Sequence, residues 1–237
     1  GTENAMEAVL QNKMKRLVQV GSASSFGYGT IDHPGNETSA FKSAKYKVDY
    51  IESKKQGQEK VIAAVKEKGL DAIVVCPTFM IGPYDSKPSS GAMIIAIAQG
   101  KLPGFSSGGK NWVYVKDVAV GVCNAMTMGR TGEAYILGGE NLTYVDAVKR
   151  IAAALGQKKL PKFIVPKPLL LFIGWLGTVS GAITKKAPKL TINLAQIACD
   201  GHYFSPKKAI EELKMPQTPI EVGVKEAQQW FIENKYL

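Results

Sequence analysis

The stretch KRLVQVGSASSFGYG, residues 15–29, decides the fold class of this chain. Residues 15–20 predict a buried strand, and Gly21, Ser22 and Ser24 follow it within four residues. A strand that ends in small and hydroxylated residues is typical of the carboxyl edge of an α/β sheet, where such folds place their chemistry. A flexible Gly/Ser turn without a function is the competing interpretation.

Strands and helices alternate along the first 155 residues. This alternation implies βαβ units, and hence a largely parallel sheet that is covered by helices on both faces. The predicted strands are 15–20, 71–76, 111–115 and 133–137, and the predicted helices are 5–10, 50–68, 91–99, 117–128 and 143–155.

Several of these helices carry recognisable end signals. Gly69 is expected to stop the helix that begins near residue 50. Asp117 is expected to cap the helix that follows it, and Thr143 with Asp146 three residues on is expected to open the next. Near the C-terminus, Thr218 precedes a proline, which predicts a hydroxyl cap with proline as the first helical residue.

The character of the chain changes after Leu155, where prolines interrupt the pattern. Residues 169–183 are strongly apolar, contain three glycines and are flanked by lysines. Because a spanning helix needs roughly 20 apolar residues, we expect a buried or pocket-lining helix and no membrane span, with monotopic membrane contact as the alternative. We therefore expect a main domain over 1–155 and a smaller, mostly helical substrate subdomain over 156–237.

The bulk composition is that of a basic globular protein. The chain has 237 residues, a net charge of +10 and a pI near 9.4. The lysines are scattered, without an arginine-rich stripe, so nucleic-acid binding is not expected. Cys76, Cys123 and Cys199 are widely spaced, which favours reduced, packed thiols in a cytoplasmic protein over disulfides. With only two histidines, no metal site is expected.

Tyr50 and Lys54 form a candidate catalytic pair. They lie one helical turn apart, so their side chains share one face of the predicted helix. The pKa of a free tyrosine is about 10, and a nearby cation stabilises the phenolate form. The spacing therefore suits a tyrosine that transfers a proton near neutral pH.

In their order and spacing, five motifs resemble the extended short-chain dehydrogenases/reductases, also described as the NAD-dependent epimerase/dehydratase family. Within that family the chain is most similar to the dihydroflavonol-reductase-like branch, and the resemblance covers essentially the whole chain. The motifs are VGSASSFG at 20–27, YIESK at 50–54, PTFMIGP at 77–83, NWVYVKDVA at 111–119 and WFIENKYL at 230–237.

The resemblance implies a Rossmann-like doubly wound parallel sheet and an NAD(P)-dependent oxidoreductase. It implies that Ser22 is the catalytic hydroxyl that binds the substrate oxygen, with Ser24 beside the substrate. Tyr50 would transfer the proton, and Lys54 would lower the tyrosine pKa and hold the nicotinamide ribose. Four residues would cradle the nicotinamide: Pro77, Thr78, Phe79 and Met80.

The cofactor implied is NADP or NAD, and the partner is a small-molecule carbonyl substrate. A homodimer is compatible with the resemblance. Relatives begin with a Gly-x-x-Gly-x-x-Gly turn that binds pyrophosphate, and no such turn precedes Ser22. We therefore expect the sequence to be the C-terminal portion of a longer protein and to bind dinucleotide poorly as it stands.

Two other functions remain open. A nucleotide-sugar epimerase or dehydratase of the same fold usually carries an arginine where Lys110 precedes Asn111, and the dehydratases carry an acidic pair where Ala23 and Ser24 stand. Both differences favour the reductase. A non-catalytic cofactor-sensing or scaffold protein is the third hypothesis, and the retention of the Tyr50–Lys54 pair argues against it.

Overall fold

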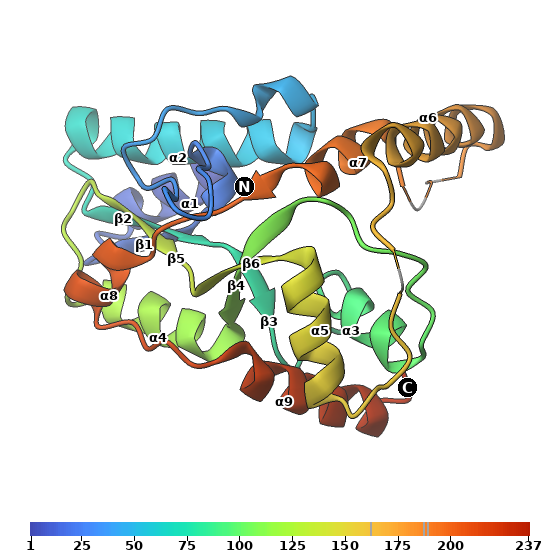
Figure 1. The fold of residues 1–237 in the computed structure, drawn as a ribbon. Coiled ribbons are helices and arrows are strands. Elements are labelled where there is room, and N and C mark those ends of the chain that lie inside the picture. Colours follow the sequence, from blue (N-terminus) through green and yellow to red (C-terminus); the bar gives the residue numbers. More distant parts are fainter. Residues whose placement is uncertain (162, 187, 189) are drawn as a thin grey trace.

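The computed structural model describes residues 1–161, 163–186, 188 and 190–237. Helices pack around two small sheets that lie next to each other, which confirms the predicted α/β class (Figure 1). The elements in chain order are α1 (Thr2–Gln11), β1 (Leu17–Val20), η1 (Ala23–Ser25), η2 (Ser43–Tyr46), α2 (Asp49–Lys68), β2 (Ala72–Pro77), β3 (Phe79–Ile81), α3 (Gly91–Ala98), β4 (Gly109–Tyr114), α4 (Val115–Ala125), β5 (Ala134–Leu137), β6 (Glu140–Thr143), α5 (Tyr144–Ala154), α6 (Lys167–Thr184), α7 (Ile192–Cys199), β7 (Gly201–His202), α8 (Lys207–Leu213) and α9 (Ile220–Glu233).

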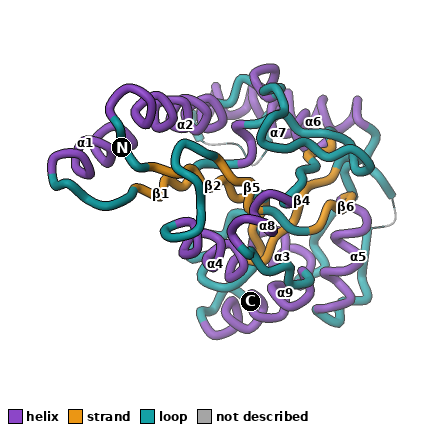
Figure 2. The backbone as a smooth tube through the Cα atoms, turned by 90° about the vertical axis from the view of Figure 1, so that its left-hand side faces the viewer, coloured by secondary structure: helices purple, strands orange, loops and turns teal. Residues whose placement is uncertain are grey.

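The first sheet is parallel throughout, as predicted, with strand order β1-β2-β5. Every residue of the central strand β2 is buried. Because side chains alternate along a strand, Val74 and Cys76 pack with α1 and α2, whereas Ile73 and Val75 pack with α4 and α8. Helices therefore cover both faces of this sheet (Figure 2).

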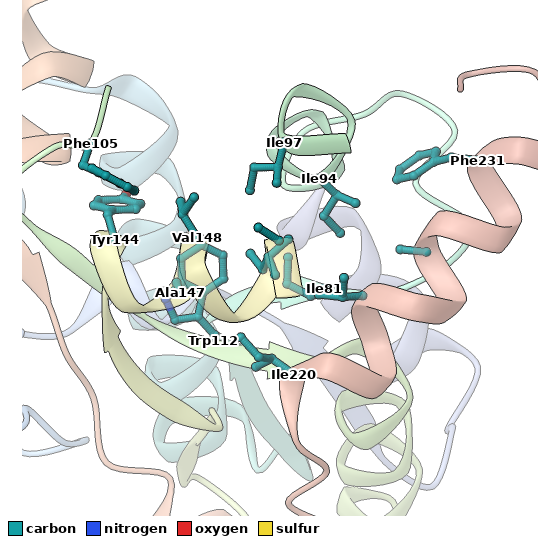
Figure 3. Packing of buried hydrophobic residues seen from close by; sticks show 14 residues of the cluster. Ile81, Ile94, Ile97, Phe105, Trp112, Tyr144, Ala147, Val148, Ile220 and Phe231 are labelled. Atoms are coloured by element: carbon teal, nitrogen blue, oxygen red, sulfur yellow. The ribbon is translucent and has the colours of Figure 1, made fainter. Parts of the chain in front are cut away.

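The second sheet was not foreseen from the sequence. β3 and β7 run parallel to β4, and β6 runs antiparallel to it. Its core lies against α3, α5 and α9, as Figure 3 shows. The fully buried Trp112 ring meets Phe79 and Tyr144 edge to face, with centroids 4.8 Å and 6.1 Å away.

Two of the predicted helix ends are confirmed and two are wrong. Gly69 ends α2 with a φ of +64°, and the Thr143 hydroxyl accepts from the Asp146 amide at 3.1 Å. Asp117 does not cap α4, which begins two residues earlier. Its carboxylate instead accepts from the Thr218 amide at 2.6 Å and from the Thr218 hydroxyl at 2.9 Å. Since the Thr218 side chain is used in this way, Pro219 is the N-cap of α9.

The apolar helix α6 is also different from its prediction. It was expected to be buried or to line a pocket, but Gly174 is the one residue of α6 that is buried. The large side chains of α6 are exposed because the helix extends away from the sheets and packs on α7 (Figure 1). The predicted boundary after residue 155 stays a prediction.

The three cysteines are free. Cys76 is fully buried, and burial raises the pKa of its thiol to about 12. Cys123 is exposed, so the expectation of a packed thiol is wrong for that residue: it points outward from α4 although its neighbours are apolar. Burial makes Cys76 a packing residue without nucleophilic character at neutral pH.

Candidate active site

Ser22 is held at the carboxyl end of β1. The Gly21 amide donates to the Val75 carbonyl at 2.8 Å, which extends the pairing of β1 with β2 by one residue. Ser22 then caps η1, and its Oγ accepts from the Ser24 amide at 3.3 Å and shares a 2.8 Å hydrogen bond with Ser24 Oγ. A side chain at Gly21 would stand 3.0 Å from Cys76 Sγ, so glycine keeps this strand end close to β2.

Tyr50 and Lys54 lie at the start of α2. Lys54 Nζ donates to the carbonyl of Val20 at 3.3 Å and stands 5.8 Å from the centroid of the Tyr50 ring. Tyr50 is 58% exposed, so its hydroxyl is accessible to a substrate. η1 also packs against α2. The structure thus brings Ser22, Tyr50 and Lys54 to the same end of β1.

The four residues predicted to cradle nicotinamide leave the neighbouring strand end. Pro77 is the last residue of β2, and the Thr78 amide donates to the Leu137 carbonyl at 3.1 Å. The Thr78 hydroxyl is engaged with Asn111 Oδ1 at 2.7 Å. Phe79 packs on the core of the second sheet, whereas Met80 is 39% exposed. Pro77 and Thr78 therefore lie at the same sheet edge as Ser22, and Phe79 turns away from it.

A buried polar cluster near this edge was missed from the sequence. The Tyr46 hydroxyl donates to Asp200 Oδ2 at 2.6 Å, and it also hydrogen-bonds His202 Nε2 at 3.0 Å and the Tyr28 hydroxyl at 2.8 Å. Lys45 Nζ adds a 2.7 Å ion pair to Asp200. The cluster joins the loop before α2 to the segment that returns from α7.

The cluster has perturbed acidities. Burial lowers the pKa of His202 to about 3, and the charge of Lys110 adds to the effect, so the imidazole is neutral. Burial by itself raises the pKa of Asp200, but hydrogen bonds from Lys45 and Tyr46 outweigh it and bring that pKa below its usual value. Residues that lie more than 150 positions apart carry no local pattern, so the sequence offered no signal for this cluster.

A second unusual feature is the burial of the Lys110 side chain. It lies on β4 in register with His202, and its Nζ stands 5.4 Å from the centroid of the Phe79 ring. Burial lowers the pKa of its ammonium to about 8. Among the described residues, no side chain forms a salt bridge with it. It is a poorly solvated cation.

The donor set at the end of β1 fits part of a nicotinamide dinucleotide. An ammonium group has three donors, and Lys54 uses one of them on Val20. The remaining donors, with the accessible Tyr50 hydroxyl, match the paired hydroxyls of a ribose. These residues would hold the ribose and leave the Ser22 side free for a substrate.

Comparison with known proteins identifies the family. A Synechocystis sp. protein named "Putative dihydroflavonol 4-reductase" is 27% identical over 242 residues, which is 100% of this chain and 70% of that protein. The crystal structure of gox2253 has a TM-score of 0.83 at 29% identity and is matched over 98% of this chain and 71% of that one. A nucleoside-diphosphate-sugar epimerase from Pseudomonas aeruginosa has a TM-score of 0.80 at 26% identity, over 98% of this chain and 71% of that one.

These likenesses confirm the expected Rossmann-like fold and the resemblance to dihydroflavonol reductases, and the family description below names the expected nicotinamide cofactor. The model described as "NAD dependent epimerase/dehydratase family" matches residues 1–138. The chain therefore belongs to the NAD dependent epimerase/dehydratase family.

Proposed function

We propose that this protein is an oxidoreductase that reduces a small carbonyl compound with NADPH or NADH. The observation that supports the proposal most directly is the anchoring of Lys54 on the Val20 carbonyl. That contact holds the Lys54 ammonium 5.8 Å from the centroid of the Tyr50 ring. Val20, whose carbonyl accepts the hydrogen bond, lies two residues before Ser22 in the chain. A phenol, a cation and a hydroxyl at one strand end are the groups that carbonyl reduction needs.

Each group has a role that follows from its chemistry. Tyr50 donates a proton to the carbonyl oxygen during reduction, and the Lys54 charge stabilises the phenolate that remains. Ser22 hydrogen-bonds the same oxygen as its negative charge develops. The Ser24 amide donates to Ser22 Oγ, and when Ser24 Oγ is the donor in the hydrogen bond that the two hydroxyls share, the Ser22 proton is free for the substrate oxygen. The cofactor, when bound, supplies the hydride.

Nucleotide-sugar epimerisation or dehydration is the second candidate. It is favoured by Lys110, a partly buried cation whose ammonium could pair with a phosphate group. Against it, Ser24 offers a hydroxyl where a dehydratase needs an acid.

A substrate panel separates the two candidates. The protein is expressed from its complete reading frame and assayed with aliphatic and aromatic ketones and aldehydes, and separately with nucleotide sugars. We expect net oxidation of the reduced cofactor with at least one simple carbonyl compound, and faster with NADPH than with NADH. Conversion of a nucleotide sugar without net change in the cofactor, together with no carbonyl reduction, would replace the first proposal by the second.

The cysteines bear on the cellular compartment in which the protein works. Free thiols at Cys76, Cys123 and Cys199 suit a reducing compartment, which supports a cytoplasmic location. A homodimer stays part of the proposal, and light scattering of the purified protein tests it. A mass of twice that of the purified polypeptide is the expected result.

A further inference from the structure

Helix α6 carries a broad apolar surface that nothing in the described fold covers. Its length and composition are those of helices that cross membranes, yet only 6% of it is buried. Contiguous exposed apolar surface of this kind marks an interaction site in a folded protein. The exposed side chains are Leu169, Phe172, Ile173, Trp175, Leu176, Val179 and Ile183.

The other face of α6 is closed. A side chain at Gly174 would come within 2.8 Å of Ala195 Cβ, and one at Gly177 would come within 2.1 Å of the Leu190 carbonyl. The glycines thus let α7 and the segment before it pack directly on the α6 backbone. Figures 1 and 2 both place α6 far from α1. The apolar face is therefore the outward face of an arm, not a surface turned toward the sheets.

The sequence interval that contains α6 carries only basic charges, although Lys167 at the start of α6 lies 3.8 Å from Asp200 and Arg150 is ion-paired with Glu140 and Glu221. Between Asp146 and Asp200 the chain contains no acidic residue, although the whole chain has 20. A second copy of the arm would bring like charges together, whereas an anionic surface would be complementary to them. The basic residues of this interval are Lys149, Arg150, Lys158, Lys159, Lys162, Lys167, Lys185, Lys186 and Lys189.

We propose that α6 docks this protein onto the surface of an anionic lipid bilayer. The apolar face enters the boundary between headgroups and acyl chains, and the flanking lysines contact the lipid phosphates. Interfacial helices bind in this way through buried apolar area and attraction to anionic lipids. α6 lies in the surface and does not cross it, because α7 packs along its glycine face and leads the chain back to β7.

Vesicle sedimentation tests the proposal on the protein expressed from its complete reading frame. We expect binding to vesicles rich in phosphatidylglycerol, at least tenfold weaker binding to phosphatidylcholine vesicles, and release by salt. Trp175, which is 49% exposed, should be quenched by brominated lipids. No binding to the anionic vesicles at low salt, or binding without quenching of Trp175, would overturn the proposal.

Matched variants locate the contact. Ile173→Glu with Leu176→Glu should abolish binding, whereas Val222→Glu with Ile232→Glu, which alters exposed apolar residues of α9, should leave it intact. Equal loss in both variants would refute an α6 contact. Circular dichroism checks folding, and if the α6 variant misfolds, the quenching of Trp175 in the wild type decides.

Two charge-reversal variants and a measurement of the oligomeric mass complete the test. Lys185→Glu with Lys186→Glu should weaken anionic-vesicle binding at least tenfold more than Lys13→Glu with Lys15→Glu. Equal weakening would mean that net charge alone is responsible, which contradicts docking through α6. A dimer that the Ile173→Glu, Leu176→Glu variant dissociates would assign the apolar face to a second copy and overturn the proposal.

Discussion

Strand β2 and helix α6 are both apolar runs, but the fold treats them in opposite ways. Every residue of β2 is buried, because helices pack on both faces of its sheet. α6 packs chiefly on α7 and leaves most of its large side chains exposed. The comparison teaches that the hydrophobicity of a segment identifies a surface to be covered, and that the surrounding elements decide what covers it.

The largest expected effect is in β2. Val74 is fully buried, and Val74→Asp would place a carboxylate between β2 and α2 without a partner. Uncompensated burial of a charge is among the most destabilising single changes, and we expect a loss of more than about 4 kcal/mol. Urea unfolding followed by circular dichroism measures it. A folded variant with a near wild-type midpoint would contradict the packing described for this sheet.

The polar cluster around His202, where the chain returns from α7 to β7, should show an intermediate effect on stability that depends on pH. The pKa of His202 falls from an unfolded value near 6.5 to about 3 in the fold, so the unfolded chain binds more protons between these values. The contribution is full above pH 6.5 and is lost as the pH falls toward 3. Between pH 6.5 and pH 5 the loss is about 2 kcal/mol.

Urea midpoints at the two pH values measure this effect in the wild type and in His202→Phe, which cannot titrate. We expect the variant to be less stable at pH 6.5, because Tyr46 loses a hydrogen bond, and to show a flatter pH dependence. An equally steep loss of stability in both proteins would mean that other groups are responsible.

The smallest effect on stability is expected in α6. Ile173 is 44% exposed, so Ile173→Glu should change the free energy of unfolding by less than about 1 kcal/mol. Urea unfolding followed by circular dichroism measures this change as well. A loss as large as that in β2 would show that the apolar face of α6 is covered within the protein.

Much of the first sheet could be predicted because its signals are local. The apolar strand β2, Gly69 and the Thr143–Asp146 cap are read from neighbouring residues, and each was confirmed. The strand expected at residues 15–20 forms as β1, but the expectation that it is buried is wrong, because β1 is the end strand of its sheet and none of its residues is buried. Strands β3, β6 and β7 have at most four residues each and were not predicted. Their pairing with β4 depends on the fold, which brings distant segments together.

The misplaced cap and the missed polar cluster share one physical cause. Asp117 was expected to bond its own helix, but its carboxylate is satisfied by Thr218, 101 residues away. Tyr46 and Asp200 meet in the same way, over 154 residues. A polar side chain has several possible partners, and only tertiary structure selects among them. The candidate site was easier, because Ser22, Tyr50 and Lys54 each lie in a short motif, although their catalytic roles stay predictions.

The turnover of Tyr50→Phe, with the protein expressed from its complete reading frame, tests the proposed chemistry most directly. Tyr50 is largely exposed, so the loss of its hydroxyl should leave the unfolding midpoint unchanged and remove only the proton donor. We predict a fall in kcat for carbonyl reduction of at least about 100-fold, while Tyr84→Phe, which alters an exposed tyrosine in the loop between β3 and α3, retains full activity. Carbonyl reduction by Tyr50→Phe at the wild-type rate would contradict the assignment.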